Sequence, residues 1–420
     1  MNAPEKKRGR WLSSFWADLK ASTDSGLLGV ARFLGLLYGP LDRNLPIDQS
    51  LKKASRYRLP SYVGWRHAFG GITWMLFMIL IVTGVLLSFY YRPSPQEAYP
   101  SIQYIVSEVP MGWLVRDLHV WSANLIVAFV LFHMARVFFS AAYKPPRETN
   151  WLIGLLLLFI VLTFGATGYL LPWDQWAYWT VSEVMDTATQ APVVGWFVGL
   201  MRGDVQVSGA TLSRFFALHV VVLPWASFAL VVFHFMLVRK HGMAPPHGEK
   251  VNNDGMAFFP DHLLRNFIVG TLVLAVTFSL AALFPRPVGD PADPFTLPSE
   301  IISSWVVVDV SLALIRYLGA WGFWLFTGLG VVLMMLPLFD RKPELRPSKR
   351  PVAMALGVVY FGGFVILWLA GRQLTSVQPG VDLRPGDPQE QVEPLRPSQD
   401  AGSESEADQV AGPSEEEAGQ

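Results

Sequence analysis

The chain has 420 residues, of which 52% are hydrophobic and 16% are charged. This balance excludes an ordinary water-soluble globule of the same length and predicts a protein embedded in a membrane. Its 33 basic residues are matched by 33 acidic ones, which argues against a nucleic-acid partner. Because the chain has no cysteine, it cannot form a disulfide, ligate a metal cluster through thiolates or carry a thioether-linked cofactor. Any metal therefore needs histidine or carboxylate ligands.

The N-terminal residues MNAPEKKRGRWLSSFW are basic, but no short apolar stretch with a small-residue cleavage site follows them. We therefore expect no removable signal peptide and a cytoplasmic N-terminus. Residues 11–39 have an amphipathic pattern that predicts a helix on the inner membrane surface, although an ordinary packing helix explains the pattern equally well. Residues 1–60 are thus interpreted as a cytoplasmic or interfacial segment.

Seven apolar stretches approach the roughly 20 residues that a helix needs to cross a bilayer. They cover residues 69–91, 114–139, 151–171, 212–238, 263–284, 317–337 and 352–370. The sequence therefore predicts an all-α, polytopic transmembrane bundle of about seven helices.

The connecting segments differ in charge. Most Lys and Arg residues lie in the first set of segments, 1–66, 140–150, 239–262 and 338–351. The alternate loops, 92–113, 172–210 and 285–315, contain only Arg92, Arg202 and Arg286 as basic residues. The positive-inside rule places the first set in the cytoplasm, so the C-terminus is expected outside, and a bacterial inner (plasma) membrane is the expected location.

Two of the alternate loops, 172–210 and 285–315, are long and contain apolar runs, which predict short helices along the membrane surface. Beyond residue 372 the composition changes to Pro, Gly, Ser, Gln and acidic residues without an aromatic residue. Residues 372–420 are therefore predicted to be a disordered acidic tail.

Four histidines lie within the second and fourth predicted spans. His119 and His133 are 14 residues apart and His219 and His234 are 15 apart, which corresponds to about 21 to 22 Å along a helix. At about 100° per residue, His119 and His133 point within about 40° of one direction on their helix. His219 and His234 point within about 60° of one direction on theirs. Since both helices run from outside to inside, His119 is level with His219, and His133 is level with His234.

Two such pairs are what two bis-histidine haems require, because each iron takes two axial nitrogens and the macrocycle fits between the helices. Four hydrogen-bonded structural histidines would match in depth only by accident, and histidine inside a membrane is costly. One shared metal ion does not fit, since the two levels are too far apart. We predict a di-haem four-helix core, with His119 and His219 on the outer iron and His133 and His234 on the inner iron.

Glycines in the first and third spans repeat with the same step as His119 and His133. They are Gly70 and Gly84 in one span and Gly154 and Gly168 in the other. Glycine lets a backbone approach a flat ring closely, although close packing of small residues between helices is the alternative explanation.

Two arginines lie three positions from the histidines of the second span, on the side of the nearer membrane face. Arg116 precedes His119 and Arg136 follows His133. Haem propionates would project toward these faces, so both arginines are candidate propionate ligands, with interfacial snorkelling as the alternative.

The other histidines are expected at or beyond helix ends on the inner side, mostly solvated. They are His67, His241, His247 and His262. His241 follows Arg239 and Lys240, and together they form a candidate site where a quinone near the inner haem takes protons from the cytoplasm; an ordinary loop is the alternative.

From about residue 57 to 245 the chain resembles the cytochrome b of chloroplast and cyanobacterial plastoquinol-plastocyanin reductases. The shared motifs are GGIT (70–73), SFYYRP (88–93), GWLVRDLH (112–119), FGATGYLLPWDQWAYW (164–179) and TLSRFFALH (211–219). The longer separation of His219 and His234 also resembles this type. Residues 256–371 resemble the separate three-helix subunit IV of those complexes, mainly through GDPADPFTLPSEI (289–301). On this basis 61–245 is the di-haem domain and 246–371 a fused, subunit-IV-like domain.

The resemblance implies two non-covalent b-type haems on the four histidines, with Arg116, Arg136 and Arg214 near the propionates. It also implies a quinol-oxidising pocket at the outer haem, a quinone-reducing pocket at the inner one, and a homodimeric complex. In the family's Q cycle a Rieske iron-sulfur protein takes one electron from quinol and passes it to a c-type cytochrome or similar carrier, while the second electron crosses the membrane through the two haems.

The sequence departs from the family at two places. Alignment through GGIT puts Ala68 where chloroplast-type proteins carry the cysteine that tethers an additional haem, so no covalently attached haem is expected. The family's outer quinone pocket carries Pro-Glu-Trp-Tyr, whereas this chain has Ser303, Ser304, Trp305 and Val306. Only Trp305 is retained for that pocket, and the carboxylate is lost.

The lost glutamate is thought to accept a proton as quinol is oxidised, and serine has no accessible pKa for this role. Glu300, one turn earlier, and Asp309, one and a half turns later, are the candidate replacements. Asp309 lies within the apolar run VVVDV, where an acid costs energy unless it is used or paired.

Three functions remain open. The first is a cytochrome b subunit of a quinol:cytochrome c, or similar carrier, oxidoreductase. The second is a divergent di-haem electron conduit in another quinone-linked complex, without a standard quinol-oxidation site. The third is a non-catalytic scaffold that holds haem for structure.

Overall fold

The structure is a computed structural model that describes residues 55–190, 194–246, 254–298 and 305–374. These residues all belong to the first of two compact units, Met1–Val381. The predictions for residues 1–54, for the acidic tail beyond 374 and for Glu300 lie outside these ranges. Within them the regular elements are helices, which confirms the predicted all-α class.

The long helices correspond to the predicted spans, with ends that differ by a few positions. They are α5 (Phe69–Ser88), α7 (Gly112–Phe139), α8 (Glu148–Leu170), α11 (Gly209–Ala217) continued by α12 (Leu223–His241), α13 (Leu263–Leu283), α15 (Ala320–Phe339) and α16 (Pro351–Leu374). In the described part of the chain, six helices are long and apolar enough to cross a membrane. The predicted span 317–337 forms α15, within which the shorter apolar helix Thr327–Phe339 lies.

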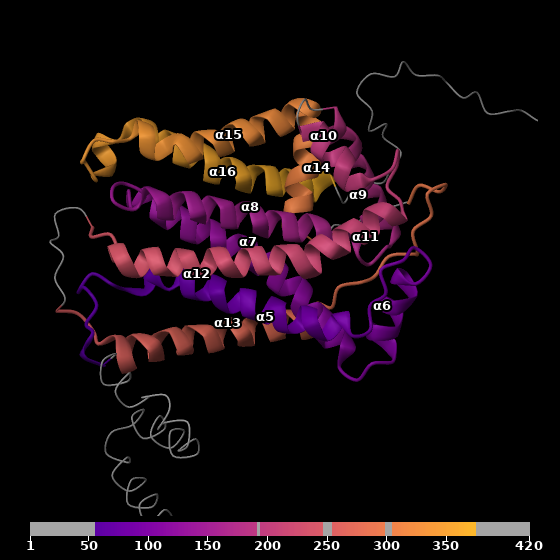
Figure 1. The fold of residues 1–420 in the computed structure, drawn as a ribbon, viewed down its shortest axis with the longest axis horizontal. Coiled ribbons are helices and arrows are strands. Elements are labelled where there is room, and N and C mark those ends of the chain that lie inside the picture. The colour runs from indigo at the N-terminus through magenta and orange to yellow at the C-terminus, as the bar shows by residue number, and fades with distance from the viewer. Residues whose placement is uncertain (1–54, 191–193, 247–253, 299–304, 375–420) are drawn as a thin grey trace, which may run out of the picture. The chain divides into compact units, whose positions relative to one another are not determined.

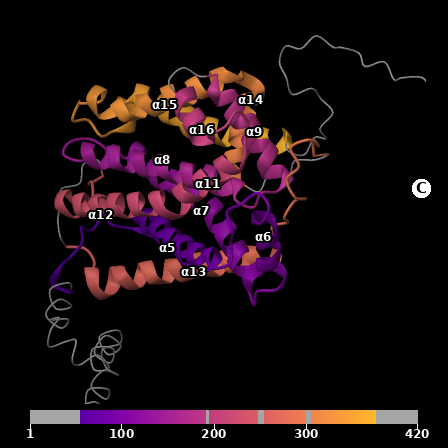
Figure 2. The ribbon, with the colours of Figure 1, turned by 45° about the vertical axis from the view of Figure 1, so that its right-hand side comes forward.

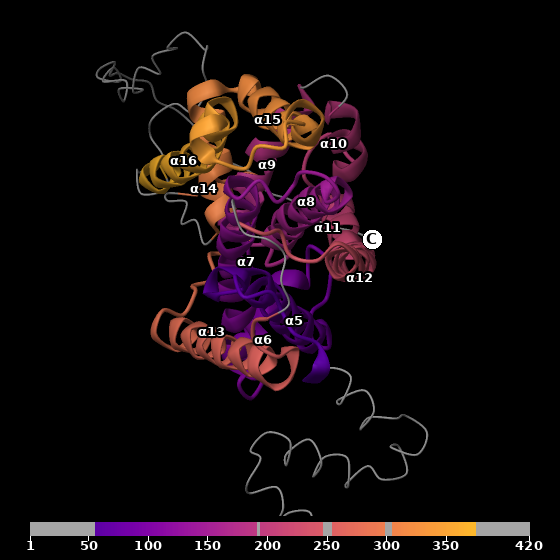
Figure 3. The ribbon, with the colours of Figure 1, turned by 90° about the vertical axis from the view of Figure 1, so that its left-hand side faces the viewer.

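The central layer of the bundle consists of α5, α7, α8 and α12. α5 packs along α7, and α8 packs along α12. On one side of this layer α13 contacts α5 and α7, and on the other side α15 and α16 contact α8 and α7 (Figures 1 and 2). Figure 3, which looks along the helices, shows α13 and the α14 to α16 group on opposite sides of the central layer. The C-terminal helices therefore flank the four-helix core from both sides.

Short helices gather at one end of the bundle, which we call the short-helix end. They are α6 (Ala98–Ser107), α9 (Gln175–Thr189), α10 (Val194–Arg202) and α14 (Val306–Leu318) (Figure 1). The last three begin within the loops predicted to contain short helices, and their position along the membrane surface stays a prediction. Asp174 starts α9 by accepting a hydrogen bond from the amide of Ala177, as expected of an N-cap aspartate.

The loop from 284 to 298, between α13 and α14, crosses the short-helix end and is held there by buried polar groups. The Arg116 guanidinium donates to the Arg286 carbonyl at 2.7 Å and to the Asp117 carboxylate at 3.0 Å. Asp174 accepts from the Gly289 amide at 3.2 Å. Burial raises the pKa of the Asp174 carboxyl, although these amide hydrogen bonds and the charge of Arg116 oppose the shift.

The opposite end contains a buried ion cluster that we call the Asp340 cluster: Tyr143, Lys144, Asp340 and Arg350. The Asp340 carboxylate accepts three hydrogen bonds. Lys144 donates at 2.8 Å, Arg350 donates at 3.0 Å and the Tyr143 hydroxyl donates at 2.5 Å. Burial alone would raise the pKa of Asp340, but the hydrogen bonds from Lys144, Tyr143 and Arg350 outweigh it and hold that pKa below its usual value. The cluster joins the loop after α7 to the loop between α15 and α16.

We expect Asp340→Ala to destabilise the protein by about 3 to 5 kcal/mol, because it leaves two buried cations without a counter-charge. The side chains of Lys144 and Arg350 are only 6% and 3% exposed. Thermal unfolding in detergent measures the loss. Glu97→Ala, which breaks the exposed Arg92–Glu97 pair, is the control and should cost at most about 1 kcal/mol. Equal effects of the two substitutions would contradict this assignment.

Candidate metal centres

The helices α7 and α12, with the turn that precedes α12, place four imidazoles in two pairs across the bundle. The ring centroids of the first pair, His119 and His219, are 6.3 Å apart, and those of the second pair, His133 and His234, are 6.5 Å apart. An imidazole nitrogen binds a transition metal at about 2 Å, and the ring centre lies about 1 Å behind that nitrogen. Two imidazoles on opposite sides of one metal therefore have centres about 6 Å apart. Both pairs have this spacing.

A threonine hydroxyl orients each imidazole of the first pair. Thr83 Oγ1 lies 2.9 Å from Nδ1 of His119, and Thr167 Oγ1 lies 3.2 Å from Nδ1 of His219. Each hydroxyl also donates to a carbonyl one turn earlier in its own helix, so it accepts from Nδ1–H. With the proton on Nδ1, the lone pair on Nε2 is available to a metal. The two hydroxyls therefore select the tautomer that a ligand needs.

A glycine of a neighbouring helix faces each of the four imidazoles. The distances from an added Cβ to the imidazole Cε1 are 3.3 Å for Gly70 with His133, 3.3 Å for Gly84 with His119, 2.5 Å for Gly168 with His219 and 3.8 Å for Gly154 with His234. These glycines therefore lie against the candidate ligands, and their approach to a haem ring stays a prediction. Glycine is required most strictly where a Cβ would overlap the ring, at Gly168.

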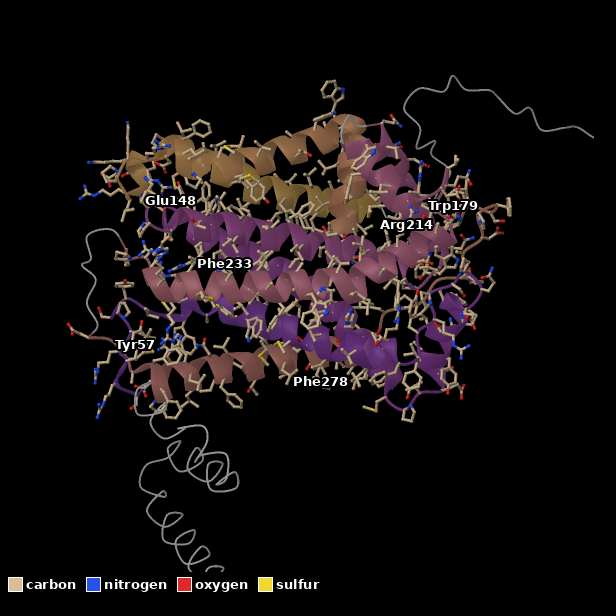
Figure 4. The ribbon with its side chains drawn as sticks, in the orientation of Figure 1. Tyr57, Glu148, Trp179, Arg214, Phe233 and Phe278 are labelled. Atoms are coloured by element: carbon tan, nitrogen blue, oxygen red, sulfur yellow. The ribbon has the colours of Figure 1, made fainter. Side chains whose placement is uncertain are left out.

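The structure places the three candidate propionate arginines in different settings. Arg116 is buried and binds Asp117 and the loop 284–298. Arg214, labelled at the short-helix end in Figure 4, is exposed and donates to the carbonyl of Leu200. Arg136 is half-buried within electrostatic range of Arg147. Their contact with propionates stays a prediction.

Three of the remaining histidines are half-buried rather than solvated. They are His67, His241 and His262, while His247 lies outside the described residues. Burial, reinforced by the charge of Arg136, lowers the pKa of His67 to about 4, so its imidazole is neutral at pH 7. Arg239 and Lys240 are exposed at the end of α12, whereas the carbonyl of His241 accepts a hydrogen bond from Arg147 at 3.2 Å. The structure therefore places the predicted inner quinone residues at one end of the bundle, and their role at a quinone site stays a prediction.

The retained Trp305 lies in the core rather than at the surface. It is 6% exposed and packs with Ile72 and Leu76 of α5, and its ring occupies the space that a Cβ on Gly165 would need. Ser303 and Ser304 lie outside the described residues.

Asp309 is 1% exposed in the first turn of α14. It lies within electrostatic range of Tyr169 and Arg286. Tyr169 directly follows Gly168, the glycine that faces His219. The acid is therefore within electrostatic range of a residue that adjoins the glycine facing His219.

Sequence reasoning missed the two threonines, although a signal was present. In both helices the threonine directly precedes the glycine that faces the first pair, giving a Thr-Gly step at 83–84 and at 167–168. The roles of Asp117 and Asp174 in holding the loop 284–298 were also missed. No local pattern marks them, because their partners, the amides of Arg286 and Gly289, are distant in the sequence.

The fold defines an integral membrane protein whose helix bundle brings together two imidazole pairs, which are its candidate metal sites. The family model "Cytochrome b/b6/petB" matches residues 54–242. The chain is 45% identical over 194 residues to cytochrome b6 of Synechocystis sp., covering 46% of this chain and 87% of that protein. Cytochrome b6 of Synechococcus elongatus is 44% identical over 211 residues, which cover 50% of this chain and 98% of that protein.

Among solved structures, the chain is similar to a chain of a "Hyperthermophilic respiratory Complex III". The TM-score is 0.67 and the sequence identity 27%, and the match covers 80% of this chain and 98% of that one. The chain therefore belongs to the cytochrome b family, whose members are haem proteins of membrane electron transport. This confirms the resemblance to cytochrome b, and the four histidines lie within the matched residues.

The glycine contacts predict a graded series of effects on haem content. Gly168→Ala should remove most of the haem at the first pair, because its Cβ would overlap the His219 ring, whereas Gly154→Ala adds only an ordinary contact and should keep both haems. Gly70→Ala and Gly84→Ala should fall between them. The haem-to-protein ratio measures the series, and Gly330→Ala, whose Cβ meets nothing within 4 Å, is the control. A larger loss from Gly154→Ala than from Gly168→Ala would refute the grading.

Proposed function

We propose that the chain is the cytochrome b subunit of a quinol:cytochrome c-type oxidoreductase of the bc/b6f class. It would hold two b-type haems, the first pair serving a quinol-oxidising site and the second a quinone-reducing site. The spacing of the two imidazole pairs, 6.3 and 6.5 Å between ring centroids, is the observation that carries the proposal. The family relationship and the likeness to a Complex III chain support it.

The residues of the first pair fit a bis-imidazole haem in geometry and in chemistry. His119 and His219 would hold the first haem between their rings, whose centroids are 6.3 Å apart. Thr83 and Thr167 hold their Nδ1 protons, so that Nε2 can donate to iron.

His133 and His234 would bind the second haem, with Gly70 and Gly154 against their rings. When bound, the two haems supply reversible one-electron centres stacked across the bilayer. The protein's own part is to fix both ligand pairs, exclude water with the apolar helices and place cationic side chains near each face.

The orientation follows from charge. Most basic loop residues lie on the side of the Asp340 cluster, so we assign that side to the cytoplasm and the short-helix end to the outside. A Rieske iron-sulfur protein and a c-type cytochrome would then dock at the short-helix end, and the chain would assemble as a homodimer in a bacterial inner membrane. Residues 256–371 would act as a fused subunit-IV-like part, supported by the way α13 and α16 flank the core.

Asp309 is the proposed replacement for the lost glutamate. It is buried within electrostatic range of Tyr169, which adjoins the glycine facing His219, and a proton acceptor for quinol is needed near the first pair. The second candidate function is a di-haem electron conduit without quinol oxidation of its own. The replacement of the Pro-Glu-Trp-Tyr glutamate by Ser304 favours that alternative.

His219→Ala tests the haem assignment. We expect the purified protein to lose the haem of the first pair and to keep the second, so that haem per chain falls by half, as measured by a haemochrome assay. His262→Ala, which alters a half-buried histidine outside both pairs, should keep both haems. Unchanged haem content in His219→Ala would reject the assignment.

Asp309→Asn tests the surrogate base. If Asp309 accepts the quinol proton, steady-state quinol:cytochrome c reduction by the purified complex should fall by about 10²- to 10⁴-fold, with haem content unchanged. Asp290→Asn, at an exposed loop position, is the matched control and should retain full turnover. Full activity in Asp309→Asn would exclude this role. Inactivity of the parent complex with both haems reducible would instead favour the conduit.

A further inference from the structure

The helix that carries His219 and His234 is not a uniform α-helix. α11 and α12 continue as one long helix (Figure 1), but Leu218–Val222 between them form a π-turn, closed by the Leu223 amide donating to the Leu218 carbonyl. A π-turn bonds residue i to i+5, so it contains one residue more than an α-turn. His219 lies within this turn, at the position of a candidate ligand.

The extra residue accounts for a mismatch in the sequence. The step from His219 to His234 is one residue longer than the step from His119 to His133 on α7, which is one α-helix. In a regular α-helix, the step of 14 residues ends about 40° short of four full turns, and the step of 15 residues ends about 60° beyond four full turns. The directions of the second histidines on the two helices would therefore differ by about 100°. One of the two imidazole pairs would then fail to meet. Because the π-turn absorbs one residue, the longer step behaves as the shorter one.

The glycines of α8 provide an independent measure of this register. Gly154 and Gly168 lie on one α-helix, and they face His234 and His219. The two glycines are 14 residues apart, whereas the two histidines that they face are 15 residues apart. Each glycine nevertheless lies against its own histidine. The two nearly equal centroid distances, 6.3 and 6.5 Å, show that both levels are in register.

Pro224 explains why the π-turn forms at this place. Proline lacks an amide hydrogen, and in an α-helix its ring collides with the carbonyl four positions earlier, here that of Val220. Widening the preceding turn relieves this collision. Val220, Val221 and Val222 are 36%, 54% and 51% exposed, so none of these three side chains is packed into the protein core.

We propose that the π-turn Leu218–Val222 is a positioning element that sets the register of His219 against His119, and that the residue it absorbs is dispensable for haem binding. The inference rests on the proposed haem sites. It predicts that the chain tolerates loss of one residue in this turn once Pro224 is replaced, because a regular α-helix with the shorter step then gives the same arrangement as the present helix.

Deletion of Val221 in a Pro224→Ala background is the test. The amounts of first-pair and second-pair haem are read by redox titration, and the His219→Ala protein marks the first-pair signal. We expect both haems at the parent ratio. Deletion of Ala128, between the histidines of the uninterrupted helix α7, is the matched control and should abolish one haem. Loss of the first-pair haem after deletion of Val221 would overturn the proposal, as would retention of both haems after deletion of Ala128.

Insertion of one alanine after Val221 keeps the proposal testable if the deletion variant does not accumulate. A second extra residue exceeds what one π-turn absorbs, so the first-pair haem should be lost and the second retained. An unchanged first-pair haem would overturn the proposal. If the parent protein itself binds no haem at either pair, the proposed function fails; if the parent binds both and only these variants disagree, the register inference alone fails.

Discussion

In the proposed function two imidazoles would hold one metal between them, and this would happen twice at different depths of the same bundle. Much of the core serves that constraint. The centroid distances of the two pairs are nearly equal, although the ligands come from helices with different residue spacing. Glycines on α5 and α8 bring the flanking backbones against the rings, and Thr83 and Thr167 fix the tautomer of the first pair. Larger side chains at these glycines, or a different step between the histidines, would separate the ligands.

The polar groups of the protein are concentrated where the helices end. At the short-helix end, Arg116 and Asp174 tie the loop 284–298 to α7 and to the start of α9. At the other end the Asp340 cluster ties the loop after α7 to the loop between α15 and α16. Between these ends the helices pack mainly through apolar side chains, with a few hydrogen bonds between helices such as those of Thr83 and Thr167 to the histidines. The buried charges therefore fix the order of the helices, while the apolar middle leaves room for the ligand pairs.

The sequence predicts the parts of this structure that depend on short-range periodicity. Apolar stretches long enough to cross a bilayer locate the long helices, and the steps between histidines and between glycines locate the four-helix core with the correct pairing. Contacts that join distant segments are not predictable in this way. Nothing near Asp117 announces that it meets the Arg286 amide, and nothing near Lys144 announces Asp340. The longer step from His219 to His234 showed that one histidine helix differs from its partner, but not that a π-turn beside Pro224 corrects the difference.

The way α13 and α16 flank the core has a consequence for how such a chain can be built. Both helices are attached by contacts that do not need the peptide connection between α12 and α13: α13 packs on α5 and α7, and α16 on α7. A covalent link between two parts that already bind each other mainly lowers the entropic cost of their association. That cost depends only weakly on the length of the linker. One polypeptide or two would therefore reach the same arrangement, and the division of these helices between genes would leave the ligand pairs unchanged.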